Sequence, residues 1–201
     1  MKHVKYTYSA AIFSLISLLA CGPSTPAKSE ARDLVPVHLT ASEGTKLVSA
    51  CTPTGPEICF NAVDDNCNGV IDEGCGVCTG DLQFTIAWGD SAANVDLIVT
   101  DPSGAVVDAQ HRATASGLTL DHDCPSDKDP CNGQNIENVC RNGADPPKGL
   151  YKVSIKLVDL MGAAAPVLVR FGGRVGSRSF GADTELSRAG EEKPVLSYEL
   201  R

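Results

Sequence analysis

Residues 82–108 read LQFTIAWGDSAANVDLIVTDPSGAVVD. Apolar side chains occupy every second position at the start of this stretch, at Leu82, Phe84, Ile86 and Trp88. That period predicts a strand with one buried face, and the apolar run at 95–99 predicts a second strand. Asp, Pro and Gly at the first, second and fourth positions of 101–104 predict a type I turn. Residues 105–108 then return as the other arm of a hairpin.

The chain that follows continues in the same way. Further short apolar segments lie at 118–120, 135–139, 150–158, 166–171 and 196–200. Seven or eight short strands separated by turn residues predict an all-β body, a β-sandwich that spans 79–201. The segment 160–165 is short and broken by glycine, which does not favour a helix.

The body also carries a family resemblance. It contains W-x6-V-D-L-I-V-T-D-P-S-G, then L-x-L-D-x-D, then E-N, then P-P-x-G-x-Y-x-V-x-I. These motifs cover most of 88–171 and resemble the YfaP-like domain of bacterial secreted proteins. In that family, the strand that corresponds to 94–99 usually reads D-L-D-L-H-V. Here Asn94 or Val95, depending on the alignment, stands in place of the first Asp, and Ile98 stands in place of the His. The resemblance implies an Ig-like or jelly-roll sandwich without an assigned biochemical role.

The resemblance also implies that acidic residues gather at one end of the sandwich. They are Asp96, Asp121, Asp123 and Glu137. Four carboxylates this close need a cation or protons to coexist. One hypothesis is therefore a second calcium site. The alternative is that 121–123 forms a solvated loop beside Cys124.

Ahead of the body, residues 57–75 read EICFNAVDDNCNGVIDEGC. Counted from Asp64, this stretch follows the D-x-[DN]-x-[DN]-G start of an EF-hand-type loop, with Gly69 at the sharp turn. The predicted calcium ligands are Asp64, Asn66, Asn68, Asp72 and Glu73. The twelfth position is Cys75 and not the bidentate Glu, which favours a truncated loop closed by a disulfide, as in thrombospondin type 3 repeats. The alternative is an acidic Asx-turn held by cystines without metal.

The same residues resemble the MopE-type metal-binding motif of surface proteins and lipoproteins of Gram-negative bacteria. The pattern E-x-C-…-D-D-N-C-N-G-x-x-D-E-G-C carries the resemblance and covers about 51–75. Phe60 and Asn61 make the first interval one residue longer than usual, and Ala62 stands where Gly is usual. The family label mentions copper. Copper favours imidazole, thiolate or thioether ligands, and this segment has no His or Met, so calcium is the expected metal.

Nine cysteines are present. One, Cys21, follows the N-terminal apolar segment, and eight lie in two clusters: Cys51, Cys59, Cys67, Cys75 and Cys78, then Cys124, Cys131 and Cys140. An even number in an exported chain predicts disulfides, in one of 105 possible connectivities. Because the clusters hold five and three cysteines, full pairing requires at least one bridge between them. That bridge would staple the segment 51–78 to the body. Zinc at the C-x-x-C of 75–78 is the weaker alternative, since no second ligand pair accompanies it.

The N-terminus predicts export. Residues 1–20 carry two lysines and then a short apolar run, as in a signal peptide, and the ending L-L-A-C resembles a lipobox. The resemblance implies lipidation of Cys21 by acyl chains such as palmitate, and Gly22 after it favours the outer membrane. An ordinary secretory signal is the alternative. Residues 21–50 are rich in Pro, Ser and charge and are expected to form a flexible tether, with a short strand near 35–39.

Composition limits the function. The net charge of −8 excludes nucleic-acid binding as a function class, and no nucleophile, zinc-protease or phosphate-loop motif is found. The sequence therefore predicts a lipid-anchored cell-envelope protein, held at the membrane by its N-terminal anchor. It would be a calcium-binding surface module without catalytic activity that meets an unknown protein or glycan. The alternative is a carboxylate-based hydrolase of extracellular polysaccharide with Asp121, Asp123 and Glu137 as catalytic acids.

Overall fold

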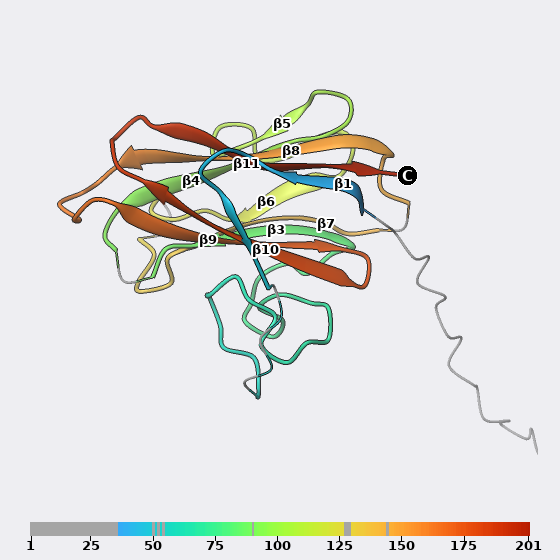
Figure 1. The fold of residues 1–201 in the computed structure, drawn as a ribbon, viewed down its shortest axis with the longest axis horizontal. Coiled ribbons are helices and arrows are strands. Elements are labelled where there is room, and N and C mark those ends of the chain that lie inside the picture. Colours follow the sequence, from blue (N-terminus) through green and yellow to red (C-terminus); the bar gives the residue numbers. More distant parts are fainter. Residues whose placement is uncertain are drawn as a thin grey trace, which may run out of the picture. The chain divides into compact units, whose positions relative to one another are not determined.

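Alternating apolar residues form the strands of two stacked antiparallel sheets (Figure 1). The computed structural model describes residues 36–49, 51, 53, 55–89, 91–126, 130–143 and 145–201. Within these residues the chain forms eleven strands and no helix, which confirms the predicted all-β fold. No helix in this part of the chain is therefore long and apolar enough to cross a membrane. The predicted signal peptide and Cys21 lie outside the described residues.

The strands divide into a five-stranded and a six-stranded sheet. The five-stranded sheet has the order β1 (Pro36–Ala41), β11 (Glu192–Leu200), β8 (Gly149–Asp159), β4 (Asn94–Thr100) and β5 (Val106–Val107). The six-stranded sheet has the order β2 (Lys46–Val48), β10 (Arg178–Leu186), β9 (Val167–Val175), β3 (Leu82–Ala87), β7 (Ile136–Arg141) and β6 (Leu118–His122).

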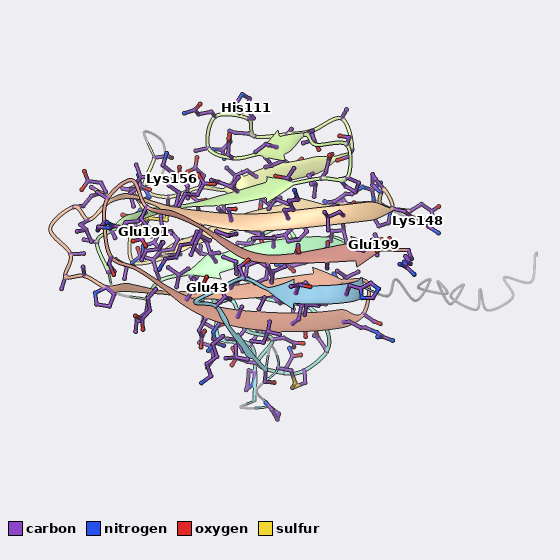
Figure 2. The ribbon with its side chains drawn as sticks, turned by 45° about the horizontal axis from the view of Figure 1, so that its top comes forward. Glu43, His111, Lys148, Lys156, Glu191 and Glu199 are labelled. Carbon is purple, nitrogen blue, oxygen red and sulfur yellow. A yellow bond between two sulfur atoms is a disulfide. The ribbon has the colours of Figure 1, made fainter. Side chains whose placement is uncertain are left out.

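The core lies between the sheets, and the first quoted stretch supplies much of it. Val95, Leu97 and Val99 alternate inward along β4 and are fully buried. Phe84 of β3 faces Tyr151 of β8 and Tyr198 of β11, and the two tyrosine rings stack with centroids 5.2 Å apart. Each such aromatic pair contributes about 0.5–1.5 kcal/mol beyond its buried area. Figure 2 shows side chains filling the space between the layers.

The predicted turn at 101–104 forms as expected. The Asp101 carboxylate accepts the N–H groups of Ser103 and Ala105 at 2.8 and 3.1 Å. Gly104 donates its N–H to the Asp101 carbonyl at 2.9 Å and has a φ of 86°. The hairpin arm is shorter than expected, because β5 pairs with β4 only at Val99 and Thr100. Beyond those residues the edge of β4 is left open.

The tether predicted for 21–50 is wrong for 36–48, and its first part, 21–35, lies outside the described residues. Residues 36–41 form β1, which pairs with β11, and 46–48 form β2, which pairs with β10. The turn between them passes from one sheet to the other, and Figure 2 places Glu43 in this turn. The alternation near 35–39 predicted a short strand, and β1 confirms it, with Leu39 packed against the core.

Residues 55–78, here called the knuckle, lie on the outer face of the six-stranded sheet (Figure 1). Gly172 of β9 allows the close approach, because a Cβ there would lie 2.4 Å from the Ala62 carbonyl oxygen. Gly69 of the knuckle contacts the hairpin turn between β9 and β10. A Cβ added to Gly69 would lie 2.6 Å from the Ser177 carbonyl oxygen. The knuckle and the sandwich belong to one compact unit.

Candidate cation-binding knuckle and the groove beside it

Four disulfides form among the eight predicted cysteines. They join Cys51 to Cys67, Cys59 to Cys75, Cys78 to Cys140 and Cys124 to Cys131. The second closes the knuckle on itself, and the first ties the knuckle to Cys51, just before it. The third joins the two cysteine clusters, so the inter-cluster bridge required by parity is confirmed. Because Cys140 lies in β7, this bridge fixes the end of the knuckle to the strand next to the β6 edge of the six-stranded sheet.

The fold of the knuckle depends on carboxylates that point inward. Asp72 is fully buried and accepts three successive backbone N–H groups, from Phe60 at 2.6 Å, Asn61 at 3.2 Å and Ala62 at 3.1 Å. Phe60 and Ala62 have positive φ values of 66° and 56°. These angles turn the three N–H groups toward one anion, as in the nests that bind anions elsewhere. Asp72 therefore acts as an internal ligand of the backbone.

Two further acids also accept backbone N–H groups inside the knuckle. Glu57 accepts the N–H groups of Asp72 at 2.8 Å and Asp65 at 3.1 Å. The Asp65 carboxylate accepts the Ile58 N–H at 3.2 Å and the Asn61 side-chain amide at 2.8 Å. Burial raises the pKa of Glu57 to about 7, and burial raises the pKa of Asp72 to about 6. The nearby charges of Glu73 and Asp65 raise the pKa of Glu57 further, so the knuckle concentrates negative charge that is poorly hydrated.

The predicted loop ligands divide into two groups. The side-chain amides of Asn66 and Asn68 both donate to Oε1 of Glu73, so these three side chains meet at one point. Asp64 lies beside them, with its Oδ1 atom accepting the Asn68 N–H at 3.0 Å and its Oδ2 atom accepting the Gly69 N–H at 2.8 Å. Gly69 has a φ of 87°, as the predicted sharp turn requires. Asp72 is directed instead to the amides of 60–62.

The residues present are a partial fit to a calcium ion. Oε2 of Glu73 is buried without a hydrogen-bond partner in the described structure, and Asp64 supplies a second carboxylate nearby. The amides of Asn66 and Asn68 turn their nitrogen atoms toward Glu73, while their oxygen atoms accept the N–H groups of Asn68 and Val70. Both amides would have to turn over to offer oxygen to an ion at Glu73. Across the described ranges, no three His, Cys, Asp or Glu side chains form a group that could hold a metal. The cluster at Glu73 draws on two asparagine amides, which are calcium ligands but do not belong to that set.

A buried polar network joins the knuckle to the sheet. Gln83 of β3 donates to the Ile71 carbonyl at 2.9 Å and to Asn138 of β7 at 3.3 Å. Asn138 donates to the Cys78 carbonyl at 2.9 Å and to Asp121 at 2.6 Å, and Asp121 accepts the Cys78 N–H at 2.7 Å. Asp121 therefore binds the knuckle and points away from the other acids expected at the second site.

Those other acids do approach one another, at the open edge of β4. Glu137 of β7 is fully buried and accepts the Leu97 N–H at 2.6 Å. Since β5 ends before this point, the carboxyl replaces the backbone acceptor that a longer strand would supply. Asp123 is 8% exposed and pairs with Arg112, and Figure 2 shows His111 of the same loop at this edge of the molecule.

The environment of this second cluster favours protons. Burial raises the pKa of Glu137 well above its usual value, and the nearby Asp96 and Asp123 raise it further. Burial and then Asp123 raise the pKa of Asp96 to about 6, although Lys156 opposite it on β8 lowers it. A protonated Glu137 can face Asp123 without repulsion, which is one of the two solutions expected from the sequence. A second calcium site here stays a prediction.

Replacing Glu137 by Gln is expected to change stability by less than about 1 kcal/mol near pH 5, because the amide imitates the neutral acid. A carboxyl with a raised folded pKa stabilises the fold below its unfolded pKa and loses that contribution as pH rises. Above the usual value of 4.5, wild type should therefore lose stability relative to Glu137→Gln, by about 1.4 kcal/mol per pH unit at most. Urea unfolding from pH 5 to 9 measures the difference. A constant difference would show that Glu137 is ionised throughout.

A groove of 980 Å³ lies between the knuckle and the outer face of the sheet. One row of its floor follows the register across three strands, from Lys46 of β2 through Asp183 of β10 to Arg170 of β9. Leu168 of β9 is 64% exposed and extends the floor. The knuckle supplies the opposite wall, and its groove residues are Phe60, Asn61 and Val63. None of the acids of either predicted metal site lines this groove.

Several important residues were not expected from the sequence. They are Glu57, Asp65, Gln83 and Asn138. Glu57 is the first residue of the E-x-C pattern of the knuckle motif, and its place in that motif indicates a structural role in the knuckle. Gln83 and Asn138 carried no such signal, because polar residues are expected on the outer face of a half-buried strand, and here the knuckle covers that face. Comparisons with protein-family models, with curated proteins and with solved structures give no match for this chain.

Proposed function

We propose that this protein is an exported, lipid-anchored binding module of the cell envelope that takes up calcium in the loop 64–73 and has no catalytic activity. The observation that carries the proposal is Oε2 of Glu73, which is buried without a hydrogen-bond partner in the described structure at the point where the Asn66 and Asn68 side chains converge beside Asp64. A hard cation accepts carboxylate and amide oxygens in such a loop. Calcium, when bound, would offset the negative charge that Glu57, Asp65 and Asp72 bring into the knuckle.

The cysteines support the export part of the proposal. Four disulfides are typical of proteins that fold in an oxidising compartment. The predicted signal and lipobox at 1–21 point to the same compartment, with the outer membrane as the proposed location. A disulfide-closed knuckle also holds the loop in one conformation before any ion binds, which reduces the entropy lost on binding.

The hydrolase alternative has less support. Glu137 is fully buried between the sheets, and Asp121 is engaged by Cys78 and Asn138. A glycosidase needs two carboxyls that flank the substrate bond. In the described structure the groove on the sheet contains neither of these acids. A binding role is therefore favoured over a carboxylate mechanism built on the predicted residues.

Calorimetric titration of the full exported chain with calcium tests the proposal. We expect a dissociation constant on the order of 10⁻⁴–10⁻³ M, as in extracellular calcium modules, and at least tenfold weaker binding in Glu73→Gln. Saturating calcium at about 100 times this constant should stabilise wild type by about 2.7 kcal/mol. Glu199→Gln is the matched control, because Glu199 of β11 is an acid outside the knuckle whose side chain is 40% exposed and pairs with Arg201. Unchanged calcium uptake in Glu73→Gln would contradict the loop assignment.

A further inference from the structure

The floor of the groove carries three basic residues and two acidic ones, and Glu191 beside Lys193 brings the acids to three. Arg170 and Asp183 form a two-point ion pair, in which one of the two contacts, Nη2 to Oδ2, is 3.3 Å long. Lys46 stands next to Asp183 in the register of the sheet. Lys193 pairs with Glu191 at 3.2 Å and also donates to the Glu185 carbonyl at 2.6 Å. Charges paired in this way give no net attraction for a strongly charged ligand.

The ion pair nevertheless keeps groups that can bind a neutral polar ligand. A guanidinium has five N–H donors and a carboxylate about four acceptor positions, so Arg170 and Asp183 do not exhaust theirs on each other. The exposed Leu168 adds apolar surface to the groove. Phe60, whose ring stacks on His122 of β6 with centroids 6.5 Å apart, lines the same groove. Fixed donors and acceptors beside apolar patches suit a sugar, whose hydroxyl groups and C–H faces alternate.

A peptide is less well suited to this groove. Peptides often bind by adding a strand to an open sheet edge. The centre of the groove floor, at Arg170 of β9 and Asp183 of β10, is paired with a neighbouring strand on both sides. At that centre the backbone groups are already engaged, and binding there depends on side chains, as in saccharide recognition. The pairing with β3 and with β2 ends at these two residues, so Leu168 and Glu185 lie beside open stretches of strand, and a peptide is the competing occupant that the binding test includes.

The knuckle wall of the groove depends on the calcium loop. Phe60, Asn61 and Val63 line the wall, and the Asp72 carboxylate fixes the first two through their backbone N–H groups. Asp72 is adjacent in sequence to Glu73, where the loop side chains converge. An ion held by Glu73 would therefore restrict Asp72, and through it the position of the groove wall.

We propose that the groove binds a neutral oligosaccharide and that calcium in the loop 64–73 strengthens this binding by ordering the knuckle wall. The calcium part rests on the proposed function, whereas the saccharide part depends on the groove residues alone. Because the coupling between two sites is reciprocal, bound saccharide also strengthens calcium uptake. The recognition elements are Arg170, Asp183, Leu168 and Phe60.

Binding of defined probes to the full chain tests this proposal. The probes are neutral hexasaccharides of glucose, mannose, galactose, xylose and N-acetylglucosamine, together with hexagalacturonate and a decapeptide library, each titrated with calcium and with chelator. We expect at least one neutral hexasaccharide to bind, and Leu168→Ala and Arg170→Gln each to weaken it about tenfold or more. Leu150→Ala is the matched control, since Leu150 is 46% exposed on the other sheet.

Removing calcium, or changing Glu73 to Gln, should weaken saccharide binding about tenfold. Equal saccharide affinity with and without calcium, in samples that do take up calcium, would overturn the coupling and leave the proposed function intact. Failure of calcium to bind would overturn the proposed function and the coupling together. Binding of only the acidic saccharide or of peptides, or full affinity in Leu168→Ala, would overturn the assignment of the groove.

Discussion

Replacing Cys78 and Cys140 together by alanine is expected to lower the free energy of unfolding by about 4 kcal/mol. This disulfide closes the longest loop of the four, with a sequence separation of 62. In the chain-entropy description, a cross-link of this span removes about 4 kcal/mol of disorder from the unfolded chain. The bridge also fixes the knuckle to β7, so its loss should free the groove wall. Urea unfolding followed by the fluorescence of Trp88, the single tryptophan, measures the change.

The matched control is the same double replacement at Cys124 and Cys131. That disulfide spans a sequence separation of 7, for which the same description gives about 2 kcal/mol. It lies away from the knuckle, so calcium uptake should be unchanged in this variant and reduced in the first. A larger loss of stability from the short bridge than from the long one would contradict loop entropy as the source of the stabilisation.

The need for such a bridge could be read from the cysteine count, whereas the pairing could not. Five cysteines in one cluster and three in the other require a link between clusters if all are paired. The cysteine that forms this link is set by the position at which the knuckle ends against the sheet. Cys78 is brought to β7 because its backbone N–H and C=O bind Asp121 and Asn138, and no spacing rule describes that contact.

The strands were predictable where large apolar residues alternate. β3, β4 and β8 were expected within one or two residues of their observed limits. β10 was missed because its inward residues include the small Ala182 and Thr184, which weaken the apolar pattern. The Gly-Ser pair at 176–177 was an available signal, since it forms the two-residue loop of the β9–β10 hairpin.

The roles of the knuckle acids were harder to predict. Spacing places Asp64 and Asp72 in one calcium loop, but a carboxylate can bind an ion or backbone amides. Positive φ angles at Phe60 and Ala62 decide the matter for Asp72. Ala62 occupies the position where the resembling motif usually has glycine, the residue that adopts such angles most readily. The motif position of Ala62 therefore indicated a positive φ angle. That this angle directs backbone N–H groups to Asp72 became visible only in the folded structure.

Replacing Asp72 by alanine is therefore expected to cost about 3 kcal/mol and to act chiefly on the knuckle. The side chain is fully buried, and its loss leaves the N–H groups of Phe60, Asn61 and Ala62 without their acceptor. Each buried unsatisfied donor costs about 1–3 kcal/mol, with some relief from local movement. Hydrogen exchange should be faster at these amides, while strands on the far sheet keep their protection. Amide-resolved exchange by NMR measures both regions.

Two variants separate this role from metal binding. Asp72→Asn keeps one acceptor oxygen and should show about half the loss, because hydrogen bonds to a charged acceptor are about twice as strong. Asp159→Ala is the matched control, since Asp159 is an exposed acid that accepts a single N–H group, from Met161 at 2.7 Å; it should cost less than about 1 kcal/mol. If Asp72 were a calcium ligand only, Asp72→Ala would leave exchange at 60–62 unchanged in the presence of chelator. Faster exchange under those conditions would establish that the carboxylate holds the backbone without any ion.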